Sequence, residues 1–469
     1  MARGLAAGEI SSRELTEDFL RRSERWQRTL NAYIEITGDR ALATAKRIDA
    51  LRCRGEKLGP LAGIPMALKD NISTRGVATT CASRVLAGYI PPYDAAVVEK
   101  LGDCPLLGKA NLDEFAMGSS NSTSAYGPAC NPWDPARSPG GSSGGSAALV
   151  AAGCAPFSLG TDTGGSVRQP AAFCGVTGFK PSYGRVSRWG LLPLAPSLDQ
   201  VGVLTPSVED CALVLQEIAG HDSRDATSAG MSVPDYRAAL GTEVSGLKIG
   251  LCPEVLADCS RGVGSALAEA ARELEKGGGQ IISVSLPFLE EAMGAYLLIA
   301  SAEAASSLAR YDGVAYGYRP LSPTLAEMYL GSRVFGPEVL RRLLLGVCSQ
   351  GKGGGNYELG QRVRRAIVSR LDALFGQVDL LLLPVVSHPA FRLDEEPDPL
   401  AMHYNDLYSI PANLAGLPAL ALPCGFSEGL PLSLQLMAPR FREDLLLAAG
   451  SWWQRRTDWH HRRPREVCS

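Results

Sequence analysis

Apolar side chains recur at helical spacing near the start of the chain. Phe19 and Trp26 are seven residues apart, which places both on one face of a helix. Ser11 and Glu14 precede this stretch with the spacing of a capping box, in which each side chain bonds the backbone N–H of the other residue. A similar apolar pattern predicts a second helix over residues 41–51.

Short apolar runs bounded by glycine or proline predict buried strands along the rest of the chain. These strands are expected at residues 61–68, 155–160, 247–252, 280–286, 378–383, 418–423 and 432–437, the last two being paired around a loop through Gly429. Helices are expected at residues 147–152, 263–276 and 361–375. Strands that alternate with helices indicate an α/β fold in which helices cover both faces of a mixed sheet. A hydrophilic connector at residues 221–225 is a candidate domain boundary.

Composition narrows the class of protein without naming an activity. The chain has 469 residues, 45% of them apolar, and a formal net charge of −3, so we expect no direct nucleic-acid binding through a basic field. The start lacks an apolar stretch long enough for a signal peptide, and no run has the length of a membrane span. We therefore expect a cytoplasmic protein that does not engage a membrane.

The twelve cysteines are scattered and show neither a Cys-x-x-Cys pair nor zinc-type spacing with histidine. In a chain without an export signal these cysteines are expected to be reduced thiols, and no metal site is expected. Cys174 lies close in sequence to a serine-rich cluster, but its apolar neighbours favour a packed thiol over a nucleophile.

Two clusters of serine and glycine are the strongest chemical signal in the sequence. They occupy residues 139–146 and 160–170. Glycine permits tight turns and lets a substrate approach main-chain amides, so a hydroxyl in such a turn is a candidate nucleophile beside an oxyanion hole. A flexible linker is the alternative for the first cluster, but an apolar helical stretch follows at once. A phosphate loop would require a lysine after the glycines, and none is present.

A serine nucleophile needs a base, and histidine is scarce in this chain. None of the five histidines lies in the first 220 residues, although sequence distance alone does not exclude a histidine from later in the chain. Lys69 ends an apolar run, and burial lowers the pKa of a lysine until the neutral amine is available as a base. A surface lysine is the commoner alternative for such a residue taken alone.

Three blocks resemble the amidase signature family in order and spacing: residues 69–71, residues 140–146 and residues 160–171. The resemblance implies a catalytic triad in which Ser166 is the nucleophile, Ser142 is a bridging serine next to a cis peptide bond, and Lys69 is the base.

The same resemblance implies that the backbone amides of Thr163, Gly164 and Gly165, with that of Ser166, form the oxyanion hole. It also implies a single large domain over residues 1–469 with a twisted mixed sheet, so we do not divide the chain at residue 220. The signature core is expected at about residues 60–210.

Three further stretches extend the likeness over nearly the whole chain. Residues 109–120, 301–313 and 405–418 resemble the A subunits of bacterial aspartyl/glutamyl-tRNA amidotransferases. This resemblance implies a glutaminase that supplies ammonia to a B-type subunit, which amidates a misacylated tRNA after activation by ATP, with a small C-type subunit completing a heterotrimer. No cofactor is then expected in this chain, and ATP and Mg²⁺ belong to the partner subunit.

Glutamine carries both charges at its amino-acid end, so its pocket requires an anion and a cation. Asp406 is the candidate for the α-ammonium group, and Arg341, or its neighbour Arg342, is the candidate for the α-carboxylate by a bidentate contact. Tyr296 is a candidate hydroxyl donor. For the two arginines, a solvated helix face is the alternative.

Two other functions stay open. The glycine-rich segment at residues 347–357 departs from the pattern of the A subunits, which favours a free-standing amidase acting on another small amide. A catalytically inactive scaffold subunit is the third interpretation, and the presence of Lys69, Ser142 and Ser166 argues against it.

Overall fold

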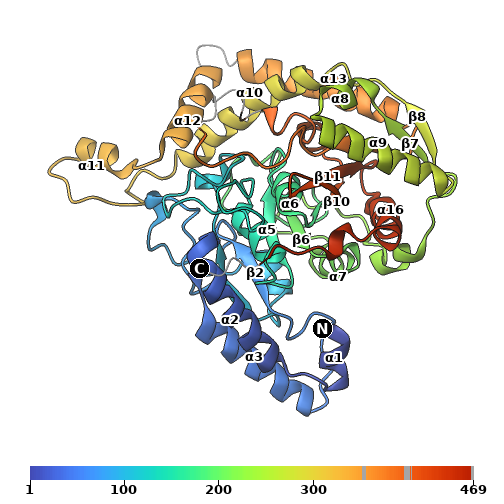
Figure 1. The fold of residues 1–469 in the computed structure, drawn as a ribbon. Helices are drawn as coiled ribbons and strands as arrows, with labels where there is room; N and C mark the ends of the chain where they lie inside the picture. The colour runs from blue at the N-terminus through green and yellow to red at the C-terminus, as the bar shows by residue number, and fades with distance from the viewer. Residues whose placement is uncertain (351–354, 396–401, 403, 466–469) are drawn as a thin grey trace.

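A computed structural model describes residues 1–350, 355–395, 402 and 404–465 of the chain (Figure 1). Its framework is a mixed sheet of eleven strands in the order β1-β3-β2-β4-β6-β5-β10-β11-β9-β7-β8. The strands are β1 Tyr33–Ile36, β2 Met66–Lys69, β3 Leu106–Ala110, β4 Ser158–Asp162, β5 Thr177–Lys180, β6 Gln200–Thr205, β7 Lys248–Leu251, β8 Gln280–Ser283, β9 Leu380–Pro384, β10 Ala419–Ser427 and β11 Leu430–Met437.

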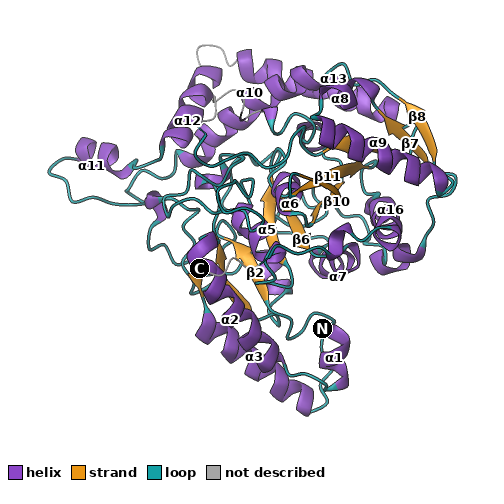
Figure 2. Cartoon of the chain, viewed as in Figure 1, coloured by secondary structure: helices purple, strands orange, loops and turns teal. Residues whose placement is uncertain are grey.

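Helices cover both faces of this sheet, as Figure 2 shows by colour. Strand β9 explains why, because Leu380 and Leu382 join the apolar core on one face while Leu381 and Leu383 join the core on the other. The first core is completed by α7 Val208–Ile218, α9 Arg261–Lys276 and α16 Glu443–Arg456. The opposite face packs against α5 Gly144–Ala151, α6 Arg168–Cys174, α10 Leu289–Leu308 and α13 Gly355–Leu374. The predicted fold class is confirmed.

The other described helices are mostly peripheral, except for a short helix, α15 Ile410–Leu414, in which every residue is buried. The others are α1 Ala2–Ala7, α2 Ser12–Leu30, α3 Gly38–Cys53, α4 Ala96–Lys100, α8 Pro253–Asp258, α11 Leu325–Ser332 and α12 Pro337–Gln350. Helix α2 begins at the predicted capping box, with both reciprocal bonds between Ser11 and Glu14 present. Figure 1 shows α11 at the tip of a projection that stands away from the body of the molecule.

Several predicted boundaries are wrong for local reasons. The strand expected at residues 61–68 begins only at Met66, because residues 60–63 form a turn in which Gly63 has a φ of 85°. The strand expected at residues 155–160 begins at Ser158, beyond Pro156, which lacks the N–H that a ladder needs. The predicted pairing of β10 with β11 is confirmed, and both strands are longer than expected.

The connector at residues 221–225 does not interrupt the sheet, since β7, β8 and β9 continue the sheet beyond β11. The chain is therefore not divided there.

The glycine-rich segment at residues 347–357, which departs from the pattern of the A subunits, lies partly outside the described residues, between the end of α12 and the start of α13. No helix in the described part of the chain is long and apolar enough to cross a membrane. The cysteines in that part are free thiols, and Cys174 is fully buried.

Candidate active site

Lys69 is the last residue of β2, and β2 runs parallel to β4. Parallel neighbours end at the same edge of a sheet, so Lys69 meets the residues that follow Gly160. The Nζ atom of Lys69 donates hydrogen bonds to Ser142 Oγ at 2.7 Å and to Thr161 Oγ1 at 3.0 Å. Lys69 and Ser142 are both fully buried, which separates their contact from bulk water.

Burial lowers the pKa of Lys69 to about 7, although the carboxylates of Asp113, Asp162 and Asp199 act in the opposite direction. A neutral amine is therefore available near neutral pH. A hydroxyl that receives a hydrogen bond from this amine can equally donate its own proton to the amine once the lone pair is free. The pair can act as a base.

Ser142 precedes α5 and follows a cis peptide bond between Gly141 and Ser142. The next residue joins the two serine clusters, because the backbone N–H of Ser143 donates to the carbonyl oxygen of Ser166 at 3.1 Å. Its hydroxyl also donates to the carbonyl oxygen of Thr161 at 3.2 Å. The two serine clusters therefore lie together in one site, as a triad with one serine from each cluster requires.

Ser166 lies in the turn between β4 and α6 and is 7% exposed. No described residue accepts a hydrogen bond from the N–H groups of Gly164, Gly165 or Ser166, and none is hydrogen-bonded to the Ser166 hydroxyl. Unpaired N–H groups beside a free hydroxyl are the arrangement that an oxyanion intermediate would use. The catalytic roles of these residues remain predictions.

Gly165 is required by its surroundings. Its φ is +150°, and a Cβ added there would overlap Ser409 Oγ and lie 2.9 Å from Asp406 Oδ1. A Cβ on Gly164 would lie 2.8 Å from the hydroxyl of Tyr296. These short distances place Tyr296 and Asp406 directly against the turn that carries Ser166.

A buried ion pair holds this turn in place. Asp162 accepts hydrogen bonds from Arg168 at 2.9 and 3.0 Å and from the backbone N–H of Val167 at 3.1 Å. Arg168 also donates to Asn413 and Gln435, each at 2.6 Å. Burial alone would raise the pKa of Asp162, but the attraction of Arg168 lowers it to about 2. The charged pair therefore ties β4 and α6 to the chain near α15 and β11.

A second carboxylate fixes the start of the turn. Asp199 accepts a hydrogen bond from Thr163 Oγ1 at 2.7 Å and two more from the N–H groups of Leu194 and Ala195. Burial raises the pKa of Asp199 to about 6. The sequence analysis did not assign Asp162 or Arg168 to the site, although both lie inside the second serine cluster and could have been identified from that position. No feature of the sequence indicated Asp199.

Asp406 is the carboxylate that lies against the turn of Ser166. It is 9% exposed, and its Oδ1 has no hydrogen-bond partner among the described residues. Burial raises the pKa of Asp406 to about 8, while Arg342 acts to lower it. A buried acceptor without a partner is costly, and a bound ammonium group would satisfy it.

Of the two candidate arginines, the structure brings Arg342, and not the predicted Arg341, close to Tyr296 and Asp406. The Arg342 side chain is 8% exposed and its charge acts on Tyr296 and Asp406, whereas the Arg341 side chain is 32% exposed. Both arginines bond Glu338, at 2.8 Å for Arg341 and 2.6 Å for Arg342. Consecutive residues of a helix point about 100° apart, so only the tertiary structure decides which one faces inward.

The described residues contain no group of three histidine, cysteine, aspartate or glutamate side chains arranged to hold a metal ion. The assignment of ATP and Mg²⁺ to a partner protein stays a prediction.

Sequence comparison finds relatives over the full length of the chain. The chain is 53% identical over 464 residues to the A subunit of the glutamyl-tRNA(Gln) amidotransferase of Moorella thermoacetica, covering 97% of this chain and 95% of that protein. It is 50% identical over 471 residues to the A subunit of the same enzyme from Chloroflexus aurantiacus, covering 99% and 97% of the two chains.

Solved structures agree with this likeness. The A subunit of the Thermotoga maritima glutamyl-tRNA(Gln) amidotransferase superposes with a TM-score of 0.78 at 38% identity, covering 93% of this chain and 90% of that one. The peptide amidase of Stenotrophomonas maltophilia gives a TM-score of 0.85 at 34% identity, covering 98% and 96%. The amidase family profile matches residues 14–447, which include every residue of the site above, and the chain therefore belongs to the amidase family.

Proposed function

We propose that this chain is the glutaminase subunit of a glutamyl-tRNA(Gln)/aspartyl-tRNA(Asn) amidotransferase. The main support for a glutaminase mechanism is the buried hydrogen bond between Lys69 and Ser142, next to the turn that contains Ser166. The kinship with A subunits along the whole chain supports the choice of glutamine as the substrate.

In the first step, Ser166 Oγ attacks the side-chain carbonyl carbon of glutamine and loses its proton to Ser142, which passes its own proton to the neutral amine of Lys69. The negative charge that develops on the carbonyl oxygen is stabilised by the free N–H groups of Gly164, Gly165 and Ser166. Asp199 holds Thr163 and so keeps the turn in the geometry that this charge requires.

In the second step, the C–N bond breaks and the proton returns from Lys69 through Ser142 to the leaving nitrogen, which departs as neutral ammonia. Ser166 is left as a glutamyl ester. A water molecule, deprotonated by the same pair, then attacks the ester carbonyl and releases glutamate and the free Ser166 hydroxyl. Lys69 gains a proton in the first step and loses it to the leaving nitrogen in the second, and it exchanges a proton in the same way when water attacks the ester, so the neutral amine is restored at the end of the cycle.

The pocket selects an amino acid by its two charges. The partnerless Oδ1 of Asp406 accepts the α-ammonium group, and the guanidinium of Arg342 binds the α-carboxylate. Tyr296 packs against Gly164 and forms the part of the glutamine pocket between Asp406 and Arg342. An uncharged amide of the same length would leave Asp406 Oδ1 without a partner and would offer no carboxylate to Arg342, which opposes its binding.

The product requires a partner. Ammonia becomes protonated in water and loses its nucleophilicity, so we assign its use to a B-type subunit that activates a misacylated tRNA with ATP and Mg²⁺, held together with this chain by a C-type subunit. Such a complex would act in the cytoplasm, where aminoacylated tRNA is used.

A free-standing amidase is the second candidate, favoured by one observation. The superposition on the peptide amidase is better, at a TM-score of 0.85, than that on the Thermotoga protein, at 0.78, although the identity is lower. An inactive scaffold is disfavoured by the intact contact of Lys69 with Ser142.

The deciding experiment measures tRNA amidation by the reconstituted complex with either glutamine or ammonium as the donor. The Ser166→Ala complex is expected to fail with glutamine, to lose labelling by a fluorophosphonate probe, and to keep amidation with ammonium. Equal failure with both donors would contradict the division of labour. Brisk hydrolysis of simple amides by an isolated chain that binds no partner would favour the free-standing amidase.

A further inference from the structure

Glu114 is a buried carboxylate that the mechanism above does not use. It is 2% exposed and lies in the short turn of 3₁₀ helix Glu114–Ala116. One of its oxygens accepts a hydrogen bond from the Ser83 hydroxyl. The other, Oε2, accepts the backbone N–H of Gly336 at 2.7 Å, from 222 positions further along the chain. A carboxyl group is rarely buried without hydrogen-bond partners, and these two contacts account for the burial of Glu114.

The contact with Gly336 is made at the start of α12. Gly336 precedes Pro337, the first residue of this helix, and its carbonyl oxygen accepts the N–H of Leu340 at 3.0 Å. A carboxylate at the N-terminal end of a helix is favoured by the helix dipole and satisfies an N–H that has no partner within the helix. A Cβ on Gly336 would lie 2.5 Å from Glu114 Oε2, so glycine is needed for the carboxylate to reach the backbone. Glu114 therefore caps α12 from a distant part of the chain.

A ring contact beside the carboxylate fixes the same helix start. The buried rings of Phe115 and Phe335 pack edge to face, with their centroids 5.7 Å apart. Phe115 has a φ of 50°, which residues other than glycine rarely adopt, and its N–H donates to the Cys81 carbonyl oxygen at 2.9 Å. Residues 114 and 115 therefore form a fixed turn that contacts residues 336 and 335.

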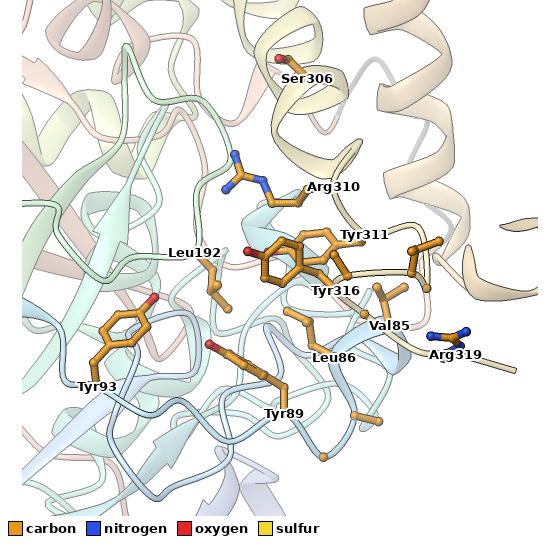
Figure 3. A pocket seen from close by; sticks show the side chains of 16 residues that line it. Val85, Leu86, Tyr89, Tyr93, Leu192, Ser306, Arg310, Tyr311, Tyr316 and Arg319 are labelled. Atoms are coloured by element: carbon orange, nitrogen blue, oxygen red, sulfur yellow. The ribbon is translucent and has the colours of Figure 1, made fainter.

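The connection between α10 and α12 passes beside open space. Val85 and Leu86 line a cavity of about 930 Å³ together with Tyr311 and Tyr316 from the loop after α10 (Figure 3). Beyond this cavity the chain runs out through α11, which projects from the body, before it returns to Gly336 (Figure 1). We therefore assign the placement of the start of α12 to the turn at residues 114–115 and not to this connection.

Arg342 lies between the capped start and the middle of α12. It follows Gly336 by six residues, which is about 9 Å along a helix. Its side chain donates to Glu338, in the first turn, at 2.6 Å. Further along, a Cβ on Gly346 would overlap the carbonyl oxygen of Ser301, so α12 packs closely on α10 there. A shift of the helix start would pivot α12 about that close contact and would move Arg342.

The main chain of the same turn also reaches the bridging serine. Asp113 donates its backbone N–H to the carbonyl oxygen of Ser142 at 3.3 Å. The N–H of Glu114 donates to Thr123 Oγ1 at 3.1 Å, and that hydroxyl donates to Asp113 Oδ1 at 2.9 Å. None of these bonds uses the Glu114 side chain. Loss of its carboxylate would therefore release the start of α12 and leave the contact with Ser142 in place.

We propose that Glu114 is a positioning residue for substrate selection, which caps α12 and thereby holds the Arg342 guanidinium where the α-carboxylate of glutamine binds. The inference rests on the proposed function, which assigns that carboxylate to Arg342. Glu114 itself touches no substrate. Its loss should weaken recognition of the α-carboxylate and should leave the attack on the side-chain amide intact.

The test compares L-glutamine with 4-aminobutanamide, which is glutamine without its α-carboxylate. Ammonia release by the full chain gives kcat and KM for both amides. The unaltered chain should prefer glutamine in kcat/KM by about 10- to 100-fold. Glu114→Ala should lower this preference by about five- to tenfold, mainly through the KM for glutamine. Gly336→Ala, which displaces the carboxylate from the opposite side, should have the same effect.

Two further variants separate positioning from general stability. Glu114→Gln should keep the preference, because its amide can accept the N–H of Gly336 and donate to Ser83. Asp210→Ala is the matched control, since Asp210 accepts the Ser207 hydroxyl at 2.6 Å at the start of α7, and it should also keep the preference. In an Arg342→Ala background, Glu114→Ala should change the preference no further, because the contact through which it acts is gone.

Hydrogen exchange over residues 337–345, followed by mass spectrometry, examines the helix start without any substrate. Exchange should be faster in Glu114→Ala than in the unaltered chain or in Asp210→Ala. Unchanged exchange together with an unchanged preference would overturn the inference. An equal fall in kcat/KM for both amides would overturn it as well, since a general loss of structure produces that result. Faster exchange in Glu114→Ala, in a chain that has no preference for glutamine, would support the capping of α12 by Glu114 and refute the glutamine pocket of the proposed function.

Discussion

The Nζ atom of Lys69 lies 2.7 Å from the Oγ atom of Ser142, and neither residue is exposed to solvent. Burial removes the amine from water, and the Ser142 hydroxyl, one of the two hydroxyls that the amine bonds, is its predicted route for proton exchange. A lysine on the surface would be protonated at neutral pH, whereas burial lowers the pKa of Lys69 to about 7.

Glutamine hydrolysis should depend on pH through Lys69. Since the neutral amine is the base, kcat/KM should rise as the pH increases through about 7 and should level off above it. Lys69→Met removes the base and should lower kcat/KM by about 10² to 10⁴-fold. Stopped assays of glutamate release from about pH 5.5 to 8.5 measure both effects. A Lys69→Met variant with the turnover and pH profile of the unaltered chain would eliminate this role.

Glutamine binding should release a proton through Asp406. Burial raises the pKa of its carboxyl group to about 8, so most of it is protonated at pH 7, and an ammonium group bound against it would drive the proton off. Calorimetric titration of a Ser166→Ala chain at pH 7, in two buffers of different ionisation enthalpy, measures this release. Asp406→Asn should abolish it and weaken binding on the order of 10- to 100-fold. Proton release that persists in Asp406→Asn would assign the ammonium contact elsewhere.

Gly165→Ala tests the turn that carries Ser166. The new Cβ would overlap Ser409 Oγ and approach Asp406, so the turn must shift and misalign the free N–H groups. A loss in kcat of roughly 10²-fold is expected, as for one lost oxyanion donor. Gly230→Ala is the matched control, because a Cβ there meets nothing within 4 Å. Full activity in Gly165→Ala would show that this turn does not hold the reacting carbonyl.

Arg168→Met tests the buried ion pair between Arg168 and Asp162. Removing the guanidinium leaves Asp162 charged and uncompensated in the core, which should cost about 3–5 kcal/mol of the free energy of unfolding. Arg13→Met breaks an ion pair of similar length, 2.8 Å, on the exposed face of α2 and should leave the stability unchanged. Urea denaturation followed by circular dichroism compares the two. Equal free energies of unfolding for the two variants would mean that the ion pair of Arg168 and Asp162 does not stabilise the fold.

Much of the fold was readable from local pattern. The capping box at Ser11, the hairpin of β10 and β11, and the alternation of strands with helices follow from the spacing of apolar residues and from turn chemistry, which act over a few residues. Boundaries were less accurate, as at β2, because a turn through Gly63 interrupts an apolar run that has the composition of a strand.

The sequence by itself determined which residues are the candidates for the chemistry, because the two serine clusters and Lys69 are identified by residue type, order and likeness to a family. Only the tertiary structure decided how they meet. The order of strands places the end of β2 beside that of β4, and the rotation of α12 turns Arg342 inward and leaves Arg341 more exposed. Asp199 reaches Thr163 across 36 positions of the chain. Such pairings depend on packing between distant segments, and no local pattern of apolar and polar residues encodes them.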